Sequence, residues 1–198
     1  MRMKSIRLGI LIAAGALHPL LASPSIVLDP AFGNLAGLPG SIVGWGFIIT
    51  NDFGYIEFNS AQFCVSPVSL PACTAPSTGV FTDIIAGFND VIVGPAGGTL
   101  FPPSVTMAYD PNLMTGIGSF QFDPSVAIGL SDFGALILSY TLTDIDPNDP
   151  NAHRLGTGVL TANASVTVAV PEPGTAGILA LILSGFAVLH RKRPRNRY

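Results

Sequence analysis

Residues 156–170, GTGVLTANASVTVAV, carry the clearest secondary-structure signal of the chain. Towards the end of this stretch, Val166, Val168 and Val170 alternate with smaller or polar residues. A period of two places successive side chains on opposite faces of a β-strand, so the pattern predicts a strand with one buried face.

The same kind of segment recurs through the middle of the chain. In residues 55–58, Ile56 and Phe58 share one face, whereas Tyr55 and Glu57 share the other. Pro, Gly, Asn and Asp interrupt the apolar segments every eight to fifteen residues, and no window shows a convincing helical period. The predicted strands are residues 41–50, 55–60, 80–88, 91–93, 104–109, 116–122, 135–143 and 156–170. We therefore expect residues 23–169 to form one all-β domain, an antiparallel β-sandwich of immunoglobulin-like shape.

The N-terminus has the layout of a secretory signal peptide. Arg2, Lys4 and Arg7 supply a positive start, and an apolar run follows as far as residue 17. We expect cleavage after Ala22, with Ala16 as the alternative. Residues 1–22 are thus predicted to be a signal helix that directs the following domain out of the cytoplasm.

The C-terminus, residues 170–198, contains three elements in a fixed order. The short segment Val170, Pro171, Glu172, Pro173 ends the preceding strand because two prolines remove backbone donors. Residues 174–189 carry no charge and would form a helix of about 24 Å, close to the ~30 Å hydrocarbon core of a bilayer. The basic residues that follow favour a cytoplasmic end; they are Arg191, Lys192, Arg193, Arg195 and Arg197.

This order of a Pro-Glu-Pro motif, an apolar helix and an arginine-rich end resembles the PEP-CTERM sorting signal of Gram-negative bacteria. The resemblance covers about the last thirty residues. It implies that a membrane protease-transpeptidase, the exosortase, recognises the tail, and that the protein is exported to the cell surface, the extracellular matrix or a biofilm. Extracellular polysaccharide is a partner that the resemblance suggests. The alternative is a plain C-terminal membrane anchor.

The predicted domain is strongly acidic. Residues 23–169 contain eleven acidic residues and one basic residue, Arg154, which gives a formal charge of −10. Such a surface repels nucleic acids and anionic lipids. It would either keep the domain soluble or attract divalent cations.

Cys64 and Cys73 are the two cysteines of the chain. Outside the cytoplasm such a pair is usually oxidised, and the spacing differs from the C-x-x-C spacing of redox sites. We expect a structural disulfide.

Two features are candidates for ligand binding. Asp144, Asp146 and Asn148 follow the D-x-D-x-N start of a calcium-binding loop, but Asp149 replaces the required glycine and Leu155 the bidentate glutamate. A solvated turn is the alternative. Trp45 lies between two glycines, and we expect it to be a core residue; the alternative is an exposed platform for a sugar.

Little in the sequence indicates catalysis. His153 is the one histidine of the domain, and no G-x-S-x-G motif is present. Possible acid–base carboxylates lie in turn-like segments; they are Asp83, Asp90, Asp110, Asp123 and Asp132. We expect a non-catalytic surface or matrix protein without a cofactor. A calcium- or carbohydrate-binding adhesion module is the alternative.

Overall fold

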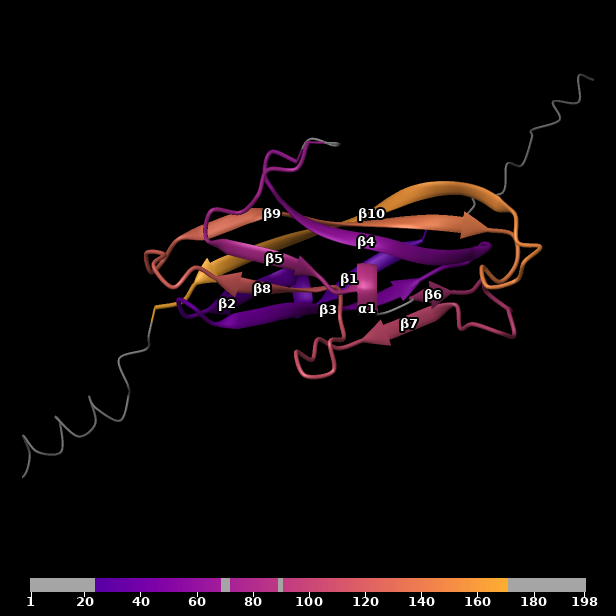
Figure 1. Ribbon diagram of the computed structural model, residues 1–198, viewed down its shortest axis with the longest axis horizontal. Coiled ribbons are helices and arrows are strands. Elements are labelled where there is room, and N and C mark those ends of the chain that lie inside the picture. The colour runs from indigo at the N-terminus through magenta and orange to yellow at the C-terminus, as the bar shows by residue number, and fades with distance from the viewer. Residues whose placement is uncertain (1–23, 69–71, 89–90, 171–198) are drawn as a thin grey trace, which may run out of the picture.

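The computed structural model describes residues 24–68, 72–88 and 91–170, and the regular secondary structure of these ranges is almost entirely β-strand (Figure 1). Two sheets enclose one apolar core, and one of the sheets curls into half a barrel. The all-β prediction is confirmed. The predicted signal helix (residues 1–22) and membrane helix (residues 174–189) lie outside the described residues.

The first sheet has the strand order β1-β3-β8-β5, and β7 also pairs with β3. All of its pairings are antiparallel. The strands are β1 (Ser25–Asp29), β3 (Ile42–Thr50), β5 (Gly79–Asp83), β7 (Ser104–Met107) and β8 (Gly118–Phe122).

The second sheet has the order β2-β10-β9-β4-β6. Here β2 runs parallel to β10, which is an exception to the predicted antiparallel arrangement. The other pairs of this sheet are antiparallel. The strands are β2 (Asn34–Gly37), β4 (Tyr55–Val65), β6 (Ile92–Val93), β9 (Ser131–Thr143) and β10 (Arg154–Val168).

The predicted strand over residues 80–88 is wrong in its second half. Strand β5 ends at Asp83, and a short helix, α1 (Ile85–Phe88), follows. The cause is local, because the Asp83 carboxylate accepts the backbone N–H groups of Ile85 and Ala86 at 2.8 and 3.2 Å and so caps the helix. Strands β1 and β2 were not among the predicted strands.

The chain crosses from the first sheet to the second between β1 and β2. A single 3₁₀ turn, η1 (Ala31–Gly33), makes the crossing directly after a cis Asp29–Pro30 bond. Gly33 has φ +67°, and a Cβ there would lie 2.5 Å from Leu28 Cδ1 and 2.6 Å from the Asn163 carbonyl. Only glycine satisfies both conditions, so the turn can lie directly on β10.

The alternation predicted for β10 holds where the strand is paired. Val166 and Val168 are fully buried, whereas Val170 lies beyond the strand end and is exposed. In β4, Ile56 and Phe58 are buried as predicted.

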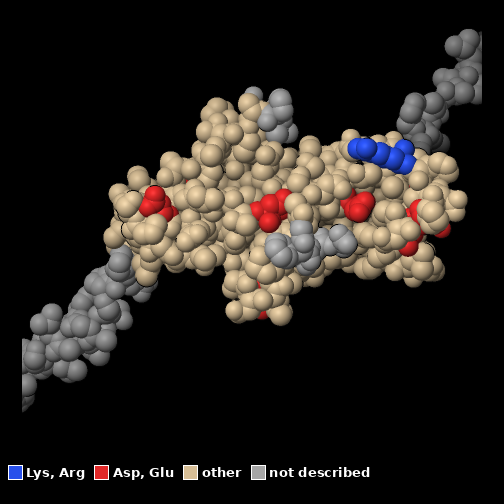
Figure 2. Space-filling model, viewed as in Figure 1, with Lys and Arg blue, Asp and Glu red and all other residues tan. Residues whose placement is uncertain are grey.

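The described surface is sparsely charged, and Figure 2 shows isolated acidic patches separated by uncharged surface.

Trp45, in β3, lies at the centre of the core and has no exposed surface. Its ring lies 5.5 Å from the ring of Phe63 in β4, across the two sheets, and 6.4 Å from Phe120 in β8. The indole N–H donates to the Gly33 carbonyl at 2.8 Å, so the crossover turn is joined to the core. The core prediction for Trp45 is confirmed, and the exposed-platform alternative is wrong.

We predict that Trp45→Phe lowers the free energy of unfolding by roughly 2–4 kcal/mol, because it leaves a cavity and an unpaired buried carbonyl at Gly33. Urea denaturation of the purified protein would measure the change. Leu113→Ala, in an exposed loop, is the control and should shift stability by less than about 0.5 kcal/mol. Equal effects of the two substitutions would contradict the prediction.

Candidate functional site

Most of the predicted sorting signal lies outside the described residues. Val170 is described and exposed, whereas Pro171, Glu172 and Pro173 and the basic residues from Arg191 to Arg197 are not described. Within residues 24–68, 72–88 and 91–170, no helix has both the length and the apolar character needed to cross a membrane.

The predicted disulfide is present between Cys64 and Cys73, whose Cα atoms lie 5.0 Å apart. Cys64 belongs to β4 and is fully buried. Next to the disulfide, Val65 forms an isolated antiparallel bridge with Thr74, so the bond closes a loop that is also held by backbone pairing. A disulfide indicates an oxidising, extracytoplasmic location.

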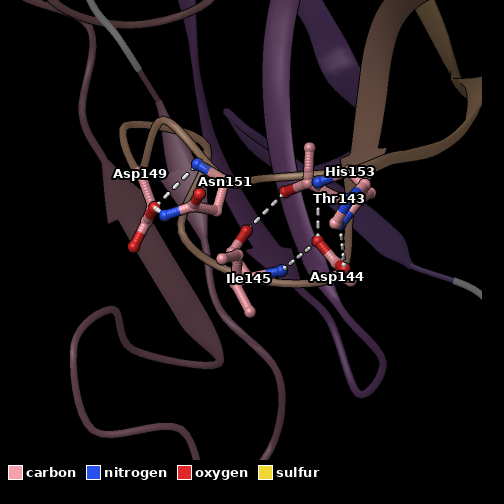
Figure 3. Close-up of polar contacts among 6 residues, drawn as sticks. All are labelled: Thr143, Asp144, Ile145, Asp149, Asn151 and His153. Carbon is pink, nitrogen blue, oxygen red and sulfur yellow. Dashed lines mark hydrogen bonds and ion pairs between the residues drawn. The ribbon is translucent and has the colours of Figure 1, made fainter.

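The loop between β9 and β10 contains the candidate calcium ligands, and Figure 3 shows the polar contacts of Asp144 and Asp149 in this loop. Asp144 Oδ1 accepts the backbone N–H groups of Ile145 and His153 at 2.9 and 2.8 Å. Its Oδ2 lies 3.1 Å from His153 Nδ1. These bonds, first of all the one from the His153 backbone, hold the pKa of the Asp144 carboxyl below its usual value of 3.8. Asp144 therefore closes the base of the loop.

The other acidic side chains of this loop also bond locally. Asp146 Oδ1 accepts the Asn148 backbone N–H at 2.9 Å. Asp149 Oδ1 accepts both the backbone N–H and the side-chain amide of Asn151, at 2.8 and 3.0 Å. In the described part of the chain, no three His, Cys, Asp or Glu side chains form a group that could hold a metal ion. The geometry is that of consecutive Asx turns.

We predict that about 1 mM Ca²⁺ changes the melting temperature of the protein by less than about 1 °C, because each loop carboxylate already accepts a backbone donor. Differential scanning calorimetry with and without chelator would measure the shift. A rise of several degrees that Asp144→Ala abolishes would contradict this prediction.

Three of the other candidate carboxylates also accept hydrogen bonds from backbone N–H groups. Asp83 caps α1 and accepts the Ala61 N–H at 2.8 Å, Asp110 accepts the Asn112 N–H at 2.8 Å, and Asp123 accepts the Ser125 N–H at 2.7 Å. The backbone and side-chain bonds from Ser125 lower the pKa of the Asp123 carboxyl. Asp90 lies outside the described residues.

Asp132 differs because it is 7 % exposed and joins the two sheets. From β9 its Oδ2 accepts the backbone N–H groups of Ser77 and Thr78 and the Thr78 hydroxyl, each at 2.8 Å. Its Oδ1 accepts the Ser77 hydroxyl at 2.9 Å. Ser77 and Thr78 directly precede β5 of the first sheet. Burial raises the pKa of the Asp132 carboxyl, but the bonds from Thr78 and Ser77 outweigh it, and the pKa lies below the usual 3.8.

We predict that Asp132→Ala lowers the free energy of unfolding by roughly 2–4 kcal/mol, because the donors of the buried Thr78, together with those of Ser77, lose their acceptor. Since the folded state lowers this pKa, the stabilisation is complete above the usual 3.8 and is lost as the pH falls through the folded pKa. Urea denaturation from neutral to acid pH would show that the free energy of unfolding of Asp132→Asn depends less on pH than that of the wild type. Asp52→Asn, at an exposed position, is the charge-matched control. An equal loss of acid dependence in this control would contradict the role assigned to Asp132.

A groove of about 470 Å³ lies on the outer face of the second sheet, and the sequence did not indicate it. Exposed rings and polar side chains contribute to its lining; they include Phe32, Asn34, Phe133, Thr161, Asn163 and Ser165. The period-two pattern of β9 could have placed Phe133 on the outer face, opposite to the buried Leu136 and Leu138. The position of Phe32 depends on a positive φ, which no sequence pattern here indicates.

No protein-family model and no curated protein matches this chain.

Proposed function

We propose that this chain is an exported, non-catalytic protein of the cell surface or extracellular matrix, anchored through residues 174–189 and sorted through its Pro-Glu-Pro tail by an exosortase-type protease. The observation that carries the proposal is the order of the chain. A disulfide-linked β-domain ends with β10 at Val168, and the sequence Val170, Pro171, Glu172, Pro173 follows after Ala169.

The chemistry of the domain supports a role without catalysis. The described carboxylates named above accept local backbone N–H groups or, in Asp132, hold the sheets together. His153 is exposed and contacts Asp144. These side chains are used to fix turns and strands, and we assign no catalytic role to them.

We further propose that the domain is immunoglobulin-like. Such sandwiches have strands A, B, E and D in one sheet and G, F and C in the other. The orders β1-β3-β8-β5 and β10-β9-β4 correspond to these when β1, β3, β4 and β5 are taken as A, B, C and D. The disulfide departs from the pattern of antibody domains, because it joins β4 to the loop after it instead of joining the sheets.

The second candidate function, a binding module, is favoured by one observation, which is the groove on the second sheet. The Asp144 loop and Trp45 give it less support, since the loop carboxylates are engaged and the ring is buried.

We predict that the mature protein from its native host ends near residues 171–174 and is found in the matrix or joined to a new anchor. Intact-mass spectrometry combined with membrane fractionation would measure both properties. A species that retains Tyr198 and pellets with membranes would contradict sorting and would indicate a plain C-terminal anchor.

A further inference from the structure

We propose that the groove between Phe32 and Phe133 binds a chain of neutral sugar residues. This assignment goes beyond surface display, and it concerns a site that neither the sorting tail nor the loop at Asp144 includes. Four observations support it: the floor of the groove, its unused hydrogen-bonding groups, its exposed rings and its lack of charge.

The floor is built by register across three strands. Ser165 of β10 pairs with Asn34 of β2 on one side and with Phe133 of β9 on the other. In the next row on this face, Asn163 pairs with Ala135. Rows on one face are two residues apart, about 7 Å along the strands. The small side chains of Ser165 and Ala135 lie between larger neighbours, which explains the hollow.

The polar groups of the floor have hydrogen-bonding capacity to spare. The Ser165 hydroxyl donates to Asn34 Oδ1 at 2.8 Å, and this bond orients the Asn34 amide. Among the described residues, neither Asn34 Nδ2 nor the Asn163 side chain forms a hydrogen bond. An amide offers two donors and an acceptor, which match sugar hydroxyls. An apolar partner would bury these groups unpaired at roughly 1–3 kcal/mol each.

Two aromatic rings border this polar floor. Phe32 is 85 % exposed and Phe133 is 65 % exposed. Binding pockets for small molecules commonly combine aromatic walls with a few polar groups that fix orientation. The apolar C–H face of a pyranose ring suits stacking on such a ring, and its hydroxyls remain free to reach the amides.

Phe32 is held in this position against its backbone preference. Its φ is +66°, in the left-handed region that a bulky residue enters only at a penalty of roughly 1–2 kcal/mol. Neither folding nor solubility explains an exposed phenylalanine there, since glycine or asparagine would satisfy the same turn. A ligand that contacts the ring would explain it.

The charge of the site selects the class of ligand. No residue that lines the groove is acidic or basic, and the domain as a whole carries a formal charge of −10. Anionic polymers, among them nucleic acids and uronic-acid polysaccharides, would be repelled without any local cation to hold them. A neutral glycan meets no such barrier.

Native affinity electrophoresis of the full chain in mild detergent would test the proposal, with dextran, xylan or galactomannan in the gel and alginate as the anionic comparison. We expect at least one neutral polysaccharide to retard the wild type. Phe133→Ala and Phe32→Gly should each weaken binding about tenfold or more. Phe53→Ala, an exposed ring in the β3–β4 turn, should bind like the wild type.

Phe32→Gly separates binding from folding. Because glycine relieves the positive φ, this variant should melt at or above the wild-type temperature while losing affinity. Retardation by none of the neutral polysaccharides, retardation by alginate alone, or unchanged binding in both groove variants would overturn the proposal. A wild-type dimer that Phe32→Gly converts to a monomer would also overturn it, because the groove would then bind a second copy. None of these results bears on where the tail is cleaved.

Discussion

The hydrogen bond from the Trp45 indole to the Gly33 carbonyl connects the core to the first place where the chain changes sheets, the turn between β1 and β2. Without that crossing, β1 would have to continue in the first sheet, and β10 would lose the parallel partner on its outer side. The turn packs on β10 because Gly33 has no side chain to collide with Asn163. A buried ring and a missing Cβ together fix how the two sheets are joined at this end.

The same turn connects the core to the surface. Phe32 directly precedes Gly33, so the bond that holds Gly33 also limits the freedom of Phe32. The positive φ of Phe32 lies directly before Gly33, whose carbonyl accepts the hydrogen bond of the buried Trp45 indole. Strain of this kind is kept only where the surrounding structure determines it. The backbone at Phe32 is therefore constrained, which limits the positions that its exposed ring can take beside the groove.

The period-two patterns predicted several strands of the two sheets, because a strand with one buried face alternates apolar and polar residues. The pattern placed Val166, Val168 and Val170 on one strand face and Ile56 and Phe58 on another, and all of these except Val170 are buried. Trp45 was expected in the core because it lies in an apolar strand, and it is buried. The pattern failed where a side chain bonds to the backbone, as when Asp83 ends β5 and caps α1. It also gave no indication of β2 or of the groove, since both depend on pairing between segments over a hundred residues apart. The sorting signal stays a prediction from the sequence, because its residues after Val170 are not described.

The hydrogen bonds of the aspartate carboxylates explain how the domain accommodates so many acidic residues. The domain has one arginine for eleven acidic residues, so most of its carboxylates lack a basic partner. Backbone N–H groups bond to the carboxylates of Asp83, Asp132 and Asp144. A carboxylate that fixes a turn has fewer lone pairs left for a cation, so a high density of aspartate does not by itself make a metal site. Recognition by this domain must then depend on groups that the fold has not already used. Unpaired amides and exposed rings are such groups, and the groove on the second sheet brings both kinds together.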